Sequence, residues 1–163
     1  MIIIGIDPGT AITGYGILNF VKNKPLKVVS YGCISTQANT IMSSRLLTLY
    51  HEIEKLLDKH KPKEIVIERI FFNTNVKTAL SVGQARGVIM LAAETRNIPL
   101  FEYTALQAKL ILTGYGRAKK KEMQLAVPKY LNLTEKIKQD DAADGLAMAI
   151  THLVKIHRYT SYA

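Results

Sequence analysis

The chain has 163 residues, which is close to the usual size of a single domain and too short for two full lobes that enclose a nucleotide. It carries 22 Lys and Arg against 13 Asp and Glu, and the resulting formal charge of +9 favours an anionic partner such as nucleic acid, although a lysine-rich proteome would also produce it. Its one cysteine, Cys33, excludes an internal disulfide, fits a reducing compartment, and lies in a strand-like run that favours a core position over a nucleophile.

The opening segment, residues 1–10, is predicted to be a buried strand that ends on a carboxylate. Its isoleucines are β-branched and fit a sheet that is covered on both faces. Asp7 follows them, and Pro8 then removes a backbone donor, so regular pairing should stop there. A surface Asp in an Asp-Pro-Gly turn is the competing interpretation.

Residues 12–21 and 26–36 predict two further strands. The connections between these strands are short, which indicates hairpins and an antiparallel meander. A helix is expected next, capped by Asn39 or Thr40 and ending near residue 60, because apolar side chains recur at three- and four-residue spacing.

The fourth predicted strand, residues 64–68, again ends on a carboxylate, Glu68. A strand, a helix and another strand imply a right-handed crossover and parallel pairing with the first strand. Asp7 and Glu68 would then emerge at the same edge, on strands about 4.8 Å apart, and could share one cation. The alternative is a strand-end charge that simply meets solvent.

Residues 69–75 are expected to form a loop with two adjacent aromatic side chains, Phe71 and Phe72. One of them should pack beneath the sheet. The other, for which we choose Phe71, is a candidate for stacking on a nucleic-acid base, an interaction that contributes about 1–3 kcal/mol.

A long helix is predicted over residues 76–96 and a fifth strand over residues 98–103. Gly83 and Gly87 lie within the helix, where each glycine costs roughly 1 kcal/mol relative to alanine, so close approach of a helix or sheet is expected to offset the cost. The helix is apolar around much of its surface, which suggests burial on two sides, one of them at a subunit interface.

Thr104 is expected to cap a helix that ends near residue 113, and a basic segment follows. Another helix should span residues 122–131 with an interruption at Pro128. Consecutive lysines cannot all lie on one helical face, so some are simply solvated. The candidate phosphate contacts are the lysines in and around this segment: Lys109, Lys119, Lys120 and Lys121.

The last helix is predicted to begin near Asp140, with Asp141 and Asp144 on one face of its first turn. Helix amino termini favour negative charge, so ordinary acid enrichment is the alternative explanation. The histidines show no metal-ligand spacing together and are expected to be structural or surface residues: His51, His60, His152 and His157. We expect one domain over residues 1–158 and a frayed tail over residues 159–163.

Carboxylates gathered from two strand ends and one helix start would repel one another unless cations intervened. Hard oxygen ligands select Mg²⁺, with Mn²⁺ as a plausible substitute, and exclude zinc and copper. Two such ions about 3.5–4 Å apart can hydrolyse a phosphodiester without a side-chain nucleophile. No apolar run long enough to cross a bilayer and no signal peptide are evident, so a cytoplasmic protein is expected.

Several segments, in order along the chain, make the sequence resemble the RuvC family of bacterial Holliday junction resolvases. They are residues 5–10 (Gly-Ile-Asp-Pro-Gly-Thr), 13–16, 67–68, Phe71, 83–87, 101–103 and 141–147. The resemblance implies an α/β, ribonuclease H-like fold with a five-stranded mixed sheet, three strands antiparallel and then two parallel, flanked by helices.

The resemblance also implies a homodimer that makes two symmetric Mg²⁺-dependent nicks in four-way junction DNA, leaving 5′ phosphates and 3′ hydroxyls, and that works with the branch-migration complex RuvA–RuvB. The family's catalytic and metal-binding acids fall on Asp7, Glu68, Asp141 and Asp144. Its DNA contacts fall on Phe71, Lys109 and Lys120. Asp140 could also share a face with Asp144, but the Asp-Ala-Ala-Asp pattern selects Asp141. Arg69, a further candidate DNA contact, stands where some relatives carry a neutral amide.

Three other functions compete with this interpretation. Actin-like ATPases and sugar kinases also open on Asp-x-Gly-Thr, but they need a second lobe that this length cannot supply. A non-catalytic module that binds branched nucleic acid would need the basic surface but not the acids. A ribonuclease H-like nuclease that processes RNA would need both.

Overall fold

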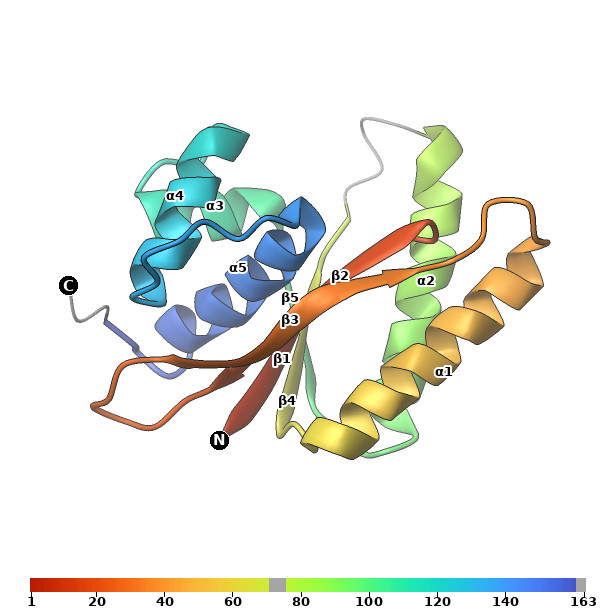
Figure 1. The fold of residues 1–163 in the computed structure, drawn as a ribbon, viewed down its shortest axis with the longest axis horizontal. Helices are drawn as coiled ribbons and strands as arrows, with labels where there is room; N and C mark the ends of the chain where they lie inside the picture. The colour runs from red at the N-terminus through yellow and green to blue at the C-terminus, as the bar shows by residue number, and fades with distance from the viewer. Residues whose placement is uncertain (71–75, 161–163) are drawn as a thin grey trace.

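The structure is a computed structural model, and it describes residues 1–70 and 76–160. One mixed sheet lies between two layers of helices (Figure 1). The elements in chain order are β1 Ile2–Asp7, β2 Ile12–Asn19, β3 Lys27–Ser35, α1 Met42–His60, β4 Glu64–Glu68, α2 Val76–Glu94, β5 Leu100–Tyr103, α3 Ala105–Thr113, α4 Lys120–Tyr130 and α5 Asp140–Lys155.

The sheet contains five strands in the order β3-β2-β1-β4-β5. The pairs β1–β2 and β2–β3 are antiparallel, whereas β1–β4 and β4–β5 are parallel, as predicted. Ile6 lies opposite Ile67 in the register. The next residue on each strand is an acid, so Asp7 and Glu68 leave the sheet side by side.

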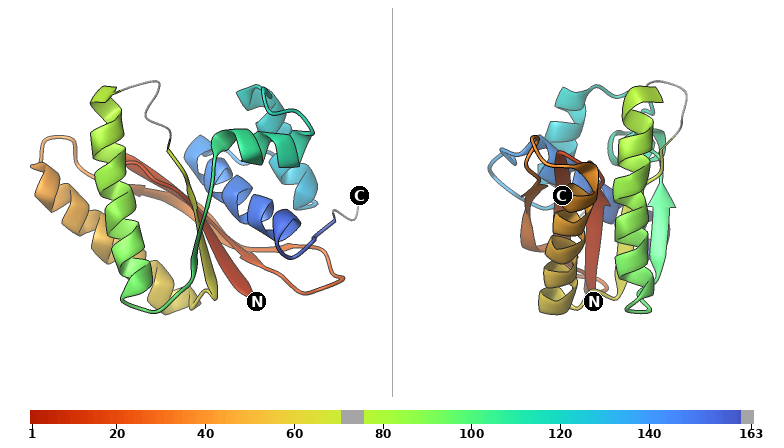
Figure 2. Two further views of the ribbon diagram at one scale, coloured as in Figure 1. Left: turned by 180° about the vertical axis from the view of Figure 1, so that it is seen from behind. Right: turned by 90° about the vertical axis from the view of Figure 1, so that its right-hand side faces the viewer.

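Alternation along the strands divides the core into two parts, one on each face of the sheet. Helices lie on both sides of the sheet (Figure 2). Ile4 and Ile65 belong to the core part that includes side chains of α1 and α2, and Ile3 and Val66 belong to the part that includes side chains of α3, α4 and α5. Because side chains on a strand point alternately to opposite faces, Asp7 shares the face of Ile3, and Glu64 and Glu68 share the face of Val66. All of these acids therefore point toward the layer that contains α5.

Glycines allow α5 to lie directly on the sheet. A Cβ atom at Gly5 would overlap the carbonyl oxygen of Gly145, and one at Gly14 would overlap the carbonyl oxygen of Asp141. These contacts hold the first turns of α5 against β1 and β2. The acids of that helix are thereby fixed beside the end of β1.

Some boundaries differ from the prediction. Helix α1 begins after Ile41, and neither Asn39 nor Thr40 caps it; Ile41 makes no side-chain cap bond. Helix α4 begins two residues early, at Lys120, because the Glu122 carboxylate accepts the Lys119 backbone N–H at 2.6 Å, and the helix continues through Pro128. Thr104 caps α3 as predicted.

Tyr159 is buried and does not belong to a frayed tail. Its backbone N–H donates to the Leu153 carbonyl at 3.0 Å, and its ring meets Phe20 edge to face at 6.4 Å. The segment after α5 therefore folds back onto the sheet layer as far as this residue.

The expected close contact at Gly83 and Gly87 is not made within the described chain. A Cβ atom at either position would meet nothing within 4 Å. Leu80, Met90 and Leu91 are exposed on the same helix. Spacings of three, four and seven residues place these five on one face of α2, so that face is open and partly apolar.

None of the helices in residues 1–70 and 76–160 is both long enough and apolar enough to cross a membrane.

Candidate active site

Asp7 and Glu68 form a hydrogen-bonded pair of carboxyl groups at the ends of β1 and β4. The pKa of Asp7 is raised to about 8, mainly by burial and also by the charges of Glu68, Asp144 and Asp141. Two carboxylates this close cannot easily both be ionised, so the pair retains a proton near neutral pH. A divalent cation would take the place of that proton.

The first turns of α5 bring two more acids to the same place. The pKa of Asp144 is raised to about 6. Burial is the main cause, Lys120 opposes it, and the charges of Glu68, Asp141 and Asp140 add to it. Asp141 in turn acts on Asp7. The predicted acids from two strands and one helix therefore interact as one electrostatic cluster, which we call the acidic cluster: Asp7, Glu68, Asp141 and Asp144.

The acidic cluster is more open than a filled metal site. Among the described residues, the group of three donors that lie within 4.8 Å of one another is Glu64, His152 and His157, not these acids. The oxygen donor set fits Mg²⁺ or Mn²⁺.

Cavities border the acidic cluster on two sides. One, of about 270 Å³, has Glu68, Asp144, Lys109 and Lys120 in its wall. A second, of about 750 Å³, is lined by Asp7, Glu68 and Arg69. Glu68 thus lies between the smaller cavity, which carries Lys109 and Lys120, and the larger cavity, which extends to Arg69 after β4. A polyanion bound in both cavities would cross Glu68.

Lys120 and Asp140 form an ion pair beside the cluster. The Lys120 Nζ lies 2.8 Å from the Asp140 Oδ2, and Gln124 donates to the other carboxylate oxygen at 2.7 Å. These contacts lower the pKa of Asp140 and raise that of Lys120. With its oxygens engaged, Asp140 is a weaker candidate for a metal ligand than Asp141.

The other predicted DNA contacts differ in position. Lys109 is half-buried in the cavity wall, whereas Arg69, Lys119 and Lys121 are exposed near the cluster or at the start of α4. The chosen stacking residue, Phe71, lies outside the described residues.

Sequence reasoning missed Arg86 as part of the site. Its guanidinium donates to the backbone carbonyl of Glu68 and to the carboxylate of Glu102. It therefore fixes the end of β4 from helix α2. An arginine flanked by apolar residues in the middle of a helix was the available signal, because a half-buried charge needs a partner.

Thr13 holds the turn that follows Asp7. Its buried hydroxyl donates to the Gly9 carbonyl at 2.6 Å and accepts the Gly9 N–H at 3.2 Å. Cys33 lies nearby on β3, where burial and the charges of Asp141 and Asp7 raise the pKa of its thiol. A raised pKa disfavours the thiolate, which agrees with the prediction that Cys33 is not a nucleophile.

Comparison with known proteins gives consistent matches over nearly the whole chain. The family model described as crossover junction endodeoxyribonuclease RuvC matches residues 3–152. A relative of that description from Ruminiclostridium cellulolyticum is 53% identical over 152 residues, which cover 93% of this chain and 91% of the relative.

Solved structures agree with this match. A Thermus thermophilus RuvC structure superposes with a TM-score of 0.89 at 28% identity and covers 97% of this chain and 96% of its own. T. thermophilus RuvC in complex with a Holliday junction substrate gives a TM-score of 0.87 at 29% identity, with 93% of this chain and 92% of that chain covered. The predicted ribonuclease H-like fold with its five-stranded mixed sheet is therefore confirmed.

Proposed function

The chain belongs to the RuvC family of crossover junction endodeoxyribonucleases, and on this basis we propose how it cuts a four-way DNA junction. It resolves Holliday junctions by hydrolysing phosphodiester bonds in two strands, and the products carry 5′ phosphates and 3′ hydroxyls. The observation that carries this function is the acidic cluster at the edge of the sheet, in a chain that matches the family from residue 3 to residue 152.

Asp7, Glu68, Asp141 and Asp144 are the proposed catalytic and metal-binding residues. Their oxygens suit hard cations, and the proton held between Asp7 and Glu68 is one that a cation can displace. Two Mg²⁺ ions held there would activate a water molecule and stabilise the leaving 3′ oxygen, and Mn²⁺ could replace them. Arg86 keeps the Glu68 end of β4 in position for this role.

The basic side chains around the cavities bind the DNA backbone in this proposal. Lys109 and Lys120 share a cavity wall with Glu68 and Asp144, which supports a role for both in contacting backbone phosphates near the cut. Exposed Arg69, Lys119 and Lys121 and the aromatic Phe71 extend the surface. Such contacts attract any DNA, and the shape of the junction selects among structures.

Two symmetric nicks require two active sites, and we infer that the open face of α2 joins two copies of the chain. Gly83 and Gly87 allow another backbone to approach, and Leu80 and Leu91 offer apolar surface that nothing in the described chain covers. Assembly with a branch-migration complex, RuvA–RuvB, and a cytoplasmic location belong to the same proposal.

The test is incubation of the full chain with a synthetic four-way junction and with linear duplex, with Mg²⁺ and with EDTA. Cleavage is expected only for the four-way junction and only when Mg²⁺ is present. Asp7→Asn should bind the junction but leave it uncut, whereas Asp58→Asn, at an exposed acid paired with Arg96, should cut normally. Binding without cleavage by the unmodified chain would favour a non-catalytic module, and faster cutting of structured RNA would favour an RNA-processing nuclease.

A further inference from the structure

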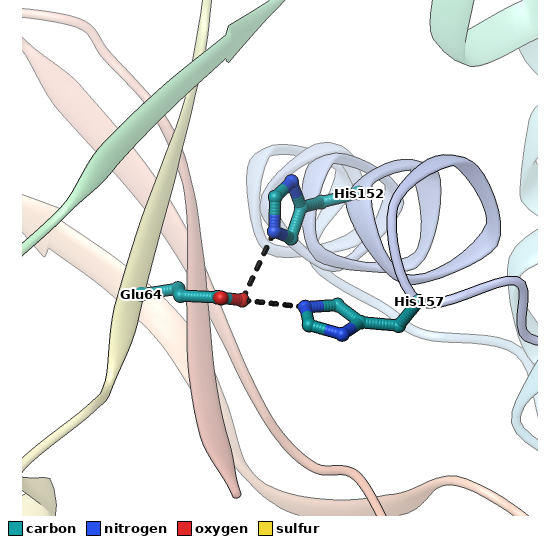
Figure 3. A group of neighbouring side chains, drawn as sticks. All are labelled: Glu64, His152 and His157. Carbon is teal, nitrogen blue, oxygen red and sulfur yellow. Dashed lines mark hydrogen bonds and ion pairs between the residues drawn. The ribbon is translucent and has the colours of Figure 1, made fainter. Parts of the chain in front are cut away.

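A second group of ligand-type side chains lies at the other end of β4 and α5. Glu64 begins β4, His152 is in the last turns of α5, and His157 follows that helix. Both Nε2 atoms meet the same Glu64 oxygen, Oε2, at 3.0 Å from His152 and 2.9 Å from His157 (Figure 3). The three donor atoms lie within 4.8 Å of one another.

This group is distinct from the acidic cluster. Glu64 and Glu68 lie on the same face of β4, about 13 Å apart at roughly 3.3 Å per residue. His152 follows Asp144 on α5 by about 12 Å, at roughly 1.5 Å per residue. The helix and the strand run in opposite directions, so they bring acids together at one end and an acid with two imidazoles at the other.

The histidines are held in place by their surroundings. His152 is fully buried, its Nδ1 lies 2.9 Å from the Tyr103 hydroxyl, and its ring packs on Phe101 at 4.3 Å. His157 packs on Phe20 at 5.4 Å. A hydrogen bond to the second ring nitrogen is the usual means of orienting a histidine that binds metal.

Tyr103 suits either protonation pattern of His152. Its hydroxyl can donate to Nδ1 while Nε2–H donates to Glu64. It can also accept from Nδ1–H, which frees the Nε2 lone pair for an ion. A proton shared with Glu64 can therefore be exchanged for a cation without loss of the buried hydrogen bond.

We propose that Glu64, His152 and His157 bind one Zn²⁺ ion. Two imidazole nitrogens and one carboxylate oxygen form a set that zinc accepts and that Mg²⁺ disfavours. Ligand bonds of about 2.0–2.1 Å in a tetrahedron separate donor atoms by roughly 3.4 Å, so the pairs at 2.9 and 3.0 Å need to open only slightly.

Solvent can reach this site, and water can supply the fourth ligand. The side chains of His157 and Glu64 are 23% and 16% exposed, whereas His152 forms the closed side. The ion would join the start of β4 to the end of α5 and to the segment that carries Tyr159. Since it binds the native arrangement alone, its role is to fasten the carboxyl-terminal segment to the sheet.

Titration of the full chain with ZnSO₄, followed by calorimetry, tests the site in saturating Mg²⁺, which occupies the acidic cluster. One equivalent of zinc should bind, and the melting temperature should rise. X-ray absorption at the zinc edge should show two imidazole ligands at about 2.0–2.1 Å. That spectrum needs no variant, and a shell of oxygens alone would overturn the proposal.

Variants then assign the ligands. His157→Gln and Glu64→Gln should each weaken zinc binding at least tenfold, and Tyr103→Phe should weaken it by about 10–100-fold through His152. The matched control is His51→Gln, at an exposed histidine whose Nδ1 lies 3.4 Å from a single carboxylate, that of Glu54; zinc affinity should not change.

Two further results would overturn the proposal. One is zinc binding that Asp7→Asn abolishes and His157→Gln leaves intact, because the ion would then belong to the acidic cluster. The other is no binding at all, which would leave Glu64, His152 and His157 as a hydrogen-bonded group only. Junction cleavage with Mg²⁺ should persist in His157→Gln, so failure here is separable from failure of the proposed nuclease activity.

Discussion

Asp7→Asn should make the metal-free protein more stable while it removes cleavage. In the native state the pKa of Asp7 is raised from 3.8 to about 8, so its carboxyl group stays protonated at pH values where the unfolded chain ionises it. As pH rises from about 4 to about 8, ionisation therefore stabilises the unfolded state and native stability falls. Asparagine is neutral throughout and removes this loss.

The size of the effect follows from the raised pKa. Each pH unit between the two pKa values is equivalent to about 1.4 kcal/mol, which sets a ceiling of roughly 2 kcal/mol near pH 5 and roughly 5 kcal/mol near pH 8. The asparagine would still be buried beside Glu68, Asp141 and Asp144, so the substitution removes only part of the cost, and we expect about 1–3 kcal/mol near pH 8. For a chain of this length that corresponds to roughly 3–10 °C in melting temperature.

Thermal and urea unfolding in EDTA, near pH 5 and near pH 8, would measure this difference. The stabilisation should be larger at the higher pH, and added Mg²⁺ should raise the melting temperature of the unmodified chain more than that of Asp7→Asn. Asp58→Asn is the control, because Arg96 lowers the pKa of Asp58 and its loss should not stabilise the protein. A variant at position 7 that is equally or less stable near pH 8 would refute the reasoning.

Three other substitutions test the surroundings of the cluster. Arg86→Ala should lower the cleavage rate about 10–100-fold and leave junction affinity nearly unchanged, because it loosens the end of β4. Equal losses of affinity in a gel-shift assay and of rate in a cleavage assay would contradict a positioning role. Lys120→Ala should reduce the slope of log affinity against log salt concentration by about 1. Lys63→Ala, at the far end of β4, is the control and should leave the slope unchanged. An unchanged slope in Lys120→Ala would show that Lys120 does not contact the DNA. Leu91→Glu should shift sedimentation toward the chain mass of 18.2 kDa without unfolding, and an intact dimer would place the interface elsewhere.

Local patterns predict much of this fold because they are set by neighbours in the chain. The carboxylates that end the first and fourth strands, together with the helix between those strands, are enough to predict that Asp7 and Glu68 are adjacent. Thr104 was identified as a cap because hydroxyls at that position accept the backbone N–H of a first helical turn. Ile41 gave no such signal, so the start of α1 was misplaced.

Features built from distant parts of the chain could not be predicted in the same way. Glu64 and His152 are separated by 88 residues, and no spacing between the histidines themselves indicates the shared carboxylate. The role of Arg86 depends on where the carbonyl of Glu68 points after the strand ends. The sequence predicts a close neighbour at Gly83 and Gly87, and no part of the described chain provides one.

The most direct test of metal-assisted cleavage by the acidic cluster is anomalous scattering from crystals soaked in Mn²⁺, recorded at the manganese edge. Two peaks about 3.5–4 Å apart should lie among the carboxylates of Asp7, Glu68, Asp141 and Asp144. Manganese bound away from these carboxylates, in a protein that still cuts junctions, would contradict the assignment.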